Sequence, residues 1–137
     1  MEYKMLNWHR FGDDRGSLVA LEANKDIPFA VKRVFYIFGT KDKRVVRGSH
    51  ANLHSSFVMV MLKGSCNVMV DDGYKKTDIR LENPTQGLYL GKMLWKEMYN
   101  FSDNSVMVVL SDQHYNKDEY IRDYDVYLKM IQTTQVV

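Results

Sequence analysis

The chain has 137 residues, of which 45% are hydrophobic and 26% charged, with a formal net charge of +2. This length suffices for one domain with a real core, and the composition excludes a disordered or collagen-like chain. Because basic and acidic residues are interspersed, a dedicated nucleic-acid binder is disfavoured. We expect one domain over residues 1–137.

Two features indicate where the protein acts. Residues 1–10 contain no apolar run after basic residues, and the longest apolar run, residues 57–62, is far too short to cross a bilayer. Cys66 is the single cysteine, which rules out an intramolecular disulfide and favours a reducing compartment. We expect a cytoplasmic protein that binds neither nucleic acid nor membrane.

Short segments rich in β-branched and aromatic residues follow one another along the chain. The first is Leu18 to Leu21, after a turn at residues 13–16, and its open edges need a neighbour such as a strand of a second subunit. The further predicted strands, separated by Gly, Pro, Asn and Asp, cover residues 29–38, 57–62, 66–70, 74–81, 87–90, 96–101 and 105–110. With no helical segment between them, they predict an antiparallel sandwich or barrel.

Only the C-terminal segment has helical periodicity. From Lys117 to Gln132, apolar and aromatic residues recur at steps of three and four. Asp118 and Glu119 stand in the first turn of this segment, where carboxylates suit the helix dipole. We expect one helix here, following an otherwise all-β domain.

The segment Arg47 to Asn52 holds the most informative polar residues. A period of two places His50 and Asn52 on the same face of an extended chain. His50 is a candidate general acid or base, and Arg47 offers donors to a phosphate or a carbonyl oxygen. A histidine that only hydrogen-bonds a loop at a strand end fits equally well, and the sequence leaves both interpretations open.

A metal site is the rival interpretation of the same segment. Asn52 is a poor ligand, and His50 and His54 have no third strong ligand beside them. The sequence also has no phosphate-binding Gly-rich loop and no nucleophile elbow. We therefore expect no metal and no cofactor.

Residues 89–98 form a second candidate cluster. Tyr89 and Trp95 could build an aromatic wall for a base or a sugar. Lys96 and Glu97 are adjacent and point to opposite faces of a strand, so one of them can enter a pocket. Tyr36 could offer a phenolic proton inside a barrel. The structural alternative for each aromatic residue is a place in the core.

A series of motifs along nearly the whole chain resembles the cupin-type dTDP-sugar 3,4-ketoisomerases. They include Asp14-Arg15-Gly16-Ser17-Leu18, residues 24–38, Arg47-Gly48-x-His50-Ala51, Gly64-Ser65-Cys66, residues 87–91, Trp95-x-Glu97-Met98 and residues 118–125. The resemblance implies a metal-free, cofactor-free cupin double-stranded β-helix (a jelly-roll barrel) with a short C-terminal helix. It also implies a homodimer with swapped N-terminal strands.

The resemblance further implies an isomerase that acts on dTDP-4-keto-6-deoxyglucose. A base removes the proton from C3, an enediol forms, and a proton returns at C4, so that the carbonyl moves from C4 to C3. The chemistry needs donors that stabilise an oxyanion and no redox cofactor. The product, a dTDP-3-keto-6-deoxyhexose, feeds an aminotransferase that makes 3-amino-3,6-dideoxy sugars for lipopolysaccharide and S-layer glycans.

The resemblance assigns roles by motif position. His50 matches the first histidine of the family's His-Ala-His and is implied to transfer protons. Tyr36 is implied to line the sugar pocket beside Arg47. The residues implied to contact sugar, diphosphate or thymine are Arg15, Arg33, Arg47, Tyr89, Trp95 and Lys96.

Two positions depart from the family pattern. Asn52 stands at the second histidine, the position of an expected base, and an amide accepts no proton at neutral pH. Either the enzyme works with His50 and Tyr36 alone, or the chain is an inactive variant that holds substrate; the intact remainder of the pattern slightly favours the second. Lys96 stands where some relatives have histidine, which leaves the galacto or gluco configuration of the product open.

Two other functions fit the same residues. A 3,5-epimerase of similar fold also removes protons beside a C4 carbonyl, but no aspartate is clearly placed to form a dyad with His50. A non-catalytic cupin that binds a nucleotide sugar would keep the binding groups and lose a base, as Asn52 suggests.

Overall fold

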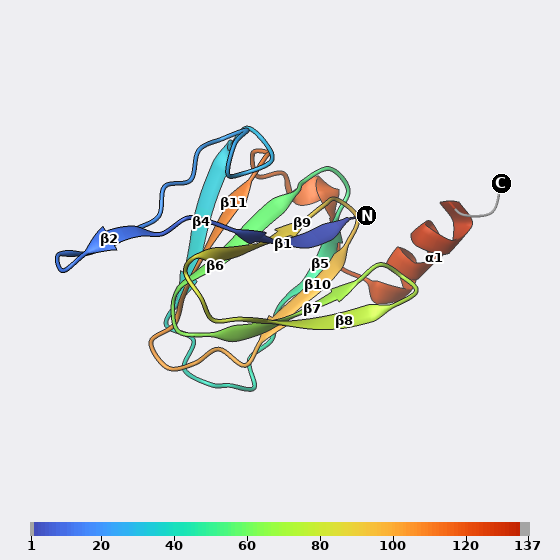
Figure 1. The fold of residues 1–137 in the computed structure, drawn as a ribbon. Helices are drawn as coiled ribbons and strands as arrows, with labels where there is room; N and C mark the ends of the chain where they lie inside the picture. Colours follow the sequence, from blue (N-terminus) through green and yellow to red (C-terminus); the bar gives the residue numbers. More distant parts are fainter. Residues whose placement is uncertain (1, 135–137) are drawn as a thin grey trace.

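The structure is a computed structural model that describes residues 2–134, and most of its regular elements are β-strands (Figure 1). One five-stranded sheet has the order β1 (Tyr3–Asn7), β9 (Gln86–Leu90), β6 (Phe57–Lys63), β11 (Val106–Ser111) and β4 (Arg33–Phe38). The second has the order β12 (Tyr120–Ile121), β5 (Arg47–Asn52), β10 (Trp95–Tyr99), β7 (Cys66–Asp71) and β8 (Lys76–Leu81). Because neighbouring strands in both sheets are antiparallel, the predicted all-β, antiparallel class is confirmed.

One apolar cluster between the two sheets forms the main core. Every second residue of a strand points into it, as the period of two requires. The second sheet contributes Cys66, Val68 and Val70 from β7, and the first contributes Met107 and Val109 from β11. The two sheets therefore bury a shared interior, and their outer faces pack against other segments of the chain.

The N-terminal segments differ most from the sequence prediction. The strand expected at Leu18 to Leu21 is instead β3 (Gly16–Leu18), which pairs with β2 (Phe11–Asp13) in a hairpin. Of the strand expected over residues 29–38, only β4 is extended in the sheet. The preceding Ile27 and Phe29 pack with Val58 on the outer face of the first sheet. Burial of these apolar side chains on that face outweighs extension of the strand.

The C-terminal helix begins seven residues later than predicted: α1 covers Tyr124–Thr134, whereas the prediction began at Lys117. Residues 117–119 form a short 3₁₀ turn, η1 (Lys117–Glu119), and Tyr120 pairs with Asn52 to add β12 to the second sheet. The carboxylate of Asp123 then accepts a hydrogen bond from the backbone N–H of Val126 at 3.1 Å, which caps the first turn of α1. Strand pairing and this cap set where the helix starts.

The β2–β3 hairpin projects away from the barrel (Figure 1). All of its strand residues are exposed, including the apolar side chains of Phe11 and Leu18. The edge strand β4, which pairs with β11 on one side, also exposes apolar side chains on its outer face: Val34, Tyr36 and Phe38. Within residues 2–134, no helix has the length and apolarity to cross a membrane.

Candidate functional site

A cavity of about 140 Å³ opens inside the barrel. Its walls come from β4, β5, β6, β10 and β12, and its lining residues are Phe35, Ile37, Arg47, Gly48, His50, Phe57, Met59, Lys96, Met98 and Tyr120. Most of these side chains are apolar, and the polar groups Arg47, His50 and Lys96 converge from β5 and β10. An apolar cavity with a few convergent polar groups is the usual form of a ligand site.

A bulge in β5 brings Arg47 and His50 to the same cavity. Lys96 of β10 pairs with His50, the next residue Glu97 pairs with Gly48, and Ser49 is left without a partner. Gly48 and Ser49 both have positive φ, at 86° and 54°. A Cβ on Gly48 would lie 3.0 Å from the carbonyl oxygen of Lys96, so this close approach needs glycine. The extra residue turns Arg47 to the side of the strand that His50 occupies.

His50 presents a free ring nitrogen to the cavity. Its Nδ1 lies 3.0 Å from the carbonyl oxygen of Gly48, and since a carbonyl only accepts, Nδ1 carries the hydrogen and Nε2 carries the lone pair. The ring also packs against Tyr120 at a centroid distance of 4.8 Å. Burial lowers the pKa of His50 to about 4, and the positive charge of Lys96 adds to the shift. At neutral pH the imidazole is therefore uncharged and can accept a proton.

Lys96 is a buried cation, with 2% of its surface exposed. Its Nζ donates a hydrogen bond to Asn52 Oδ1 at 3.0 Å and lies 4.8 Å from the centre of the Phe57 ring. Loss of hydration lowers the pKa of Lys96 to about 7, while the negative charge of Glu119 opposes this shift. Both charge states of the amine are therefore populated near neutral pH.

Behind Lys96, a buried polar network reaches Glu119. The carboxylate of Glu119 accepts hydrogen bonds from the backbone N–H of Ser55 at 2.9 Å and from its hydroxyl at 2.8 Å. Burial by itself raises the pKa of Glu119. The hydrogen bonds from Ser55, the nearby Asn52 amide and the backbone N–H of His54 lower it by more, so the pKa of Glu119 is lowered overall. The amide nitrogen of Asn52 makes no well-formed hydrogen bond with the residues that the structure describes. Asn52 thus stands between a cation and a carboxylate.

Arginines gather beside the Phe57 and Tyr120 side of the cavity. The guanidinium of Arg33 lies among the rings of Phe35, Phe57 and Tyr115, at 5.3, 5.9 and 5.6 Å. Its Nε and Nη2 atoms are buried and have no hydrogen-bond partner among residues 2–134. Arg122 lies over the Tyr120 ring at 4.8 Å. Unpaired guanidinium donors beside a cavity suit an anionic ligand.

Of the predicted site residues, Tyr36 and Trp95 point away from the cavity. On β4 the cavity-facing residues are Phe35 and Ile37, so the intervening Tyr36 points outward and is 64% exposed. Tyr36 therefore does not line this cavity of its own subunit. Trp95 lies on the outer face of β10, where its Nε1 donates to Glu97 at 3.0 Å and its ring packs under α1. Lys96 faces the cavity, and because adjacent residues of a strand point to opposite faces, its neighbour Trp95 cannot face the cavity as well.

Tyr89 also lies outside the cavity. On β9, Leu88 belongs to the cluster between the sheets, and Tyr89 packs in the outer cluster with Val58. It lines a separate shallow hollow with His54 and Asp112. The expected contact of Tyr89 with a ligand beside His50 is not supported by this position.

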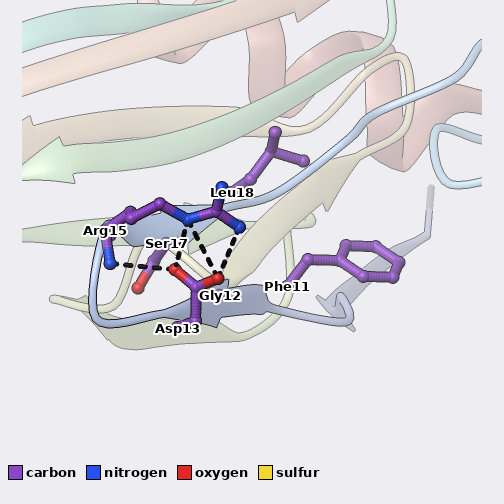
Figure 2. Close-up of a pocket in the computed structure, with 7 residues that line it drawn as sticks. Phe11, Gly12, Asp13, Arg15, Ser17 and Leu18 are labelled. Carbon is purple, nitrogen blue, oxygen red and sulfur yellow. Dashed lines mark hydrogen bonds and ion pairs between the residues drawn. The ribbon is translucent and has the colours of Figure 1, made fainter.

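Arg15 lies on the projecting hairpin, where Figure 2 shows it paired with Asp13. The two strands of the hairpin surround a hollow of about 500 Å³, lined by Phe11, Gly12, Asp13, Arg15, Gly16, Ser17 and Leu18. All of these residues belong to one exposed hairpin, so no second element of the described chain closes the hollow. Arg15 is not brought to the cavity of its own subunit.

Sequence reasoning missed Glu119, Arg122 and Tyr120. These residues lie in the first six positions of the helix predicted over residues 117–132, and Glu119 was expected in its first turn, where a carboxylate suits the helix dipole. A carboxylate in a short turn that pairs with a distant strand has no local sequence signal. Among residues 2–134, no group of three or more His, Cys, Asp or Glu side chains is placed to hold a metal ion.

Comparisons with known proteins agree on one family. The family model described as "FdtA: WxcM-like, C-terminal" matches residues 1–132. A TDP-4-oxo-6-deoxy-alpha-D-glucose-3,4-oxoisomerase from Aneurinibacillus thermoaerophilus is 48% identical over 131 residues, which cover 96% of this chain and 94% of that protein.

Solved structures agree with the sequence comparisons. A 3,4-ketoisomerase from Helicobacter canadensis is 45% identical with a TM-score of 0.93, and the match covers 96% of this chain and 98% of the other. A His-to-Asn mutant of the 3,4-ketoisomerase QdtA from Thermoanaerobacterium thermosaccharolyticum, in complex with TDP-4-keto-6-deoxyglucose, is 31% identical with a TM-score of 0.93; the match covers 98% of this chain and 97% of the other. The predicted cupin fold is confirmed by this likeness.

Proposed function

The chain belongs to the FdtA family and is a 3,4-ketoisomerase of TDP-linked sugars, and from this premise we propose that it converts dTDP-4-keto-6-deoxyglucose into a dTDP-3-keto-6-deoxyhexose. The observation that carries the proposal is the uncharged His50 imidazole in an apolar cavity between the cations Arg47 and Lys96. A 3-keto sugar is the compound that an aminotransferase requires to place nitrogen at C3, so the product suits amino-sugar synthesis.

The size of the cavity indicates that only one part of the substrate lies inside it. Its 140 Å³ is well below the ~300 Å³ of pockets that enclose a drug-sized ligand. We infer that the sugar ring enters the cavity while the diphosphate lies outside it. Arg47 lines the cavity, and Arg33 and Arg122 lie over aromatic rings of its wall; the planar forks of these arginines match phosphate oxygens.

His50 is the proposed base for the proton at C3. Removal of this proton, which is adjacent to the C4 carbonyl, gives an enediolate whose charge develops on the carbonyl oxygen. Lys96 supplies positive charge from a buried position, so it stabilises that oxyanion more strongly than it would in water, and the exposed Arg47 adds a second positive charge at the cavity. Return of the proton at C4 completes the shift of the carbonyl to C3 without a redox step.

The position of Asn52 favours an active chain over an inactive variant. The interpretation that His50 works with Tyr36 is not supported by the position of Tyr36, which points out of the barrel. Asn52 instead binds the buried amine of Lys96, a titratable group beside His50. We therefore propose that the chain turns over its substrate in spite of the missing second histidine.

We propose that the enzyme is a homodimer that exchanges its N-terminal hairpins. The β2–β3 hairpin exposes Phe11 and Leu18 and is far from its own barrel, and the outer face of β4 exposes three further apolar side chains. Exposed apolar side chains on an edge strand call for a partner. Light scattering is expected to give twice the monomer mass, and Phe11→Glu with Leu18→Glu is expected to give monomer. A monomer for the unmodified chain would contradict the dimer.

The test of the activity follows the sugar protons by NMR in heavy water. The unmodified chain is expected to convert dTDP-4-keto-6-deoxyglucose to a 3-keto sugar, and His50→Asn is expected to lose this conversion by a factor of about 10²–10⁴. Protium at C4 would show that His50 returns the C3 proton directly, and deuterium would show that the imidazolium exchanges with solvent first. Deuterium at C5 would indicate a 3,5-epimerase. Binding with no conversion to a 3-keto sugar and no exchange at any carbon would indicate a non-catalytic cupin, and either outcome contradicts the proposed function.

A further inference from the structure

The buried amine of Lys96 has a place in the site that substrate binding alone does not explain. Lys96 on β10 pairs directly with His50 on β5, and both side chains line the same cavity. The amine is held by Asn52 Oδ1 at 3.0 Å, and no other hydrogen bond to it is found among residues 2–134. An ammonium has three hydrogens, so a group with one fixed hydrogen bond keeps donors for a ligand.

We infer that Lys96 is the second proton-transfer residue of this site, serving the sugar oxygens while His50 serves the sugar carbons; the inference rests on the proposed function. In the first half, His50 Nε2 takes the proton from C3, the C3–C4 double bond forms, and the Lys96 ammonium gives a proton to O4. In the second half, the Lys96 amine takes the proton from the O3 hydroxyl, the C3 carbonyl forms, and His50 returns its proton to C4. Both residues end in their starting states, so the isomerisation balances without an oxidant or reductant.

The environment of Lys96 suits this exchange of protons. The charged or titratable groups around the Lys96–His50 pair come from several elements. They are Arg47 on β5, Tyr120 on β12, Glu119 in η1, Arg122 after β12 and Arg33 on β4, whose guanidinium lies by the Phe57 ring. Burial brings the pKa of Lys96 to about 7, which allows the amine both to give and to take a proton at neutral pH.

Asn52 and Glu119 act as positioning residues in this arrangement. Asn52 fixes the amine beside His50, and the negative charge of Glu119 holds the pKa of Lys96 above the value that burial alone would give. The amide at position 52 thus accepts a hydrogen bond from the group that replaces the missing histidine as a proton carrier.

The decisive comparison is between Lys96→Met and Lys96→Arg. Arginine keeps the positive charge but does not release its proton at any working pH, so it separates proton transfer from charge stabilisation. Both variants are expected to lose turnover by about 10²-fold or more, with TDP affinity changed only a few-fold. The exposed Lys92, changed to Met and to Arg, is the matched control and is expected to retain full turnover. Turnover by Lys96→Arg close to that of the unmodified chain would overturn the inference.

The pH profile of kcat/KM gives a second readout that a structural lysine would not move. For the unmodified chain kcat/KM is expected to fall above about pH 7 as the Lys96 ammonium loses its proton, and to fall toward about pH 4 as His50 gains one. Glu119→Gln removes the charge that raises the pKa of Lys96, so the upper limb is expected to move to lower pH. An upper limb that is unchanged in Glu119→Gln and still present in Lys96→Arg would overturn the inference.

Failure of the inference can be told from failure of the proposed function. If the unmodified chain and Lys96→Met both convert the substrate, Lys96 carries no essential proton and the isomerase assignment stands. If the unmodified chain binds the substrate without converting it, the proposed activity fails, and Lys96 does not replace the missing histidine.

Discussion

The barrel cavity and the hairpin hollow differ in what surrounds their charged groups. The hairpin hollow is larger, at about 500 Å³ against about 140 Å³, but only one exposed hairpin forms its walls. Its Arg15–Asp13 pair lies at 2.6 Å, with side chains 89% and 53% exposed, and water screens such a pair. In the smaller cavity, burial changes the proton affinity of Lys96 and His50. Burial among apolar walls, rather than the size of a hollow, makes charged groups reactive.

The largest effect on stability is expected at Glu119, in the buried polar network behind the barrel cavity. Glu119→Ala leaves the buried Ser55 hydroxyl and N–H without an acceptor, which is expected to lower the free energy of unfolding by about 3 kcal/mol. Urea denaturation measures this loss. The exposed Glu82, which meets Arg80 at 3.5 Å, is the control, and Glu82→Ala is expected to leave the transition in place. Equal effects of the two variants would remove the distinction between the regions.

A smaller effect is expected at the bulge that shapes the cavity. Gly48→Ala places a Cβ 3.0 Å from a backbone carbonyl at a φ of +86°, which is expected to cost about 1–3 kcal/mol in the free energy of unfolding. Because the bulge orients His50, turnover is expected to fall together with stability. Gly39→Ala is the matched control, since Gly39 also has positive φ but an open surrounding. It is expected to lose some stability and keep full turnover.

The affinity for TDP is expected to distinguish a buried arginine, Arg33, from an exposed one, Arg44. Arg33 has buried donors without partners, whereas Arg44 is 90% exposed and pairs with Asp42. Arg33→Ala is expected to weaken TDP binding by about tenfold, since one charge-assisted hydrogen bond contributes about 1.5 kcal/mol. Arg44→Ala is expected to leave the dissociation constant unchanged. Calorimetric titration with TDP measures both, and an unaffected Arg33→Ala would place the diphosphate elsewhere.

The smallest effect is expected in the hairpin. Asp13→Asn removes a short ion pair, but both partners are exposed, and the thermal midpoint of unfolding is expected not to change. The Arg15 guanidinium beside Asp13 lowers the pKa of that carboxyl, so Asp13 stays ionised down to more acidic pH than a free aspartate. A clear drop in the midpoint would show that the exchanged hairpin buries this ion pair itself, and not only Phe11 and Leu18, against the partner subunit.

Much of the site followed from local sequence patterns. Spacing placed His50 and Asn52 on one face and separated Lys96 from Glu97, and the structure has both arrangements. The same period of two excludes Trp95 from the face that Lys96 occupies. For β4 the pattern could not decide, because Phe35 and Ile37 on one face are as apolar as Val34 and Tyr36 on the other.

The sequence by itself determined the β class, the family and the residue types that carry the chemistry. The tertiary structure decided which face of β4 lines the cavity, where α1 begins, and how strongly Lys96 holds its proton. That proton affinity depends on the hydration that the amine loses and on Asn52 and Glu119, which lie 44 and 23 positions away in the sequence. Only packing brings these groups together, because no local pattern specifies contacts between distant strands.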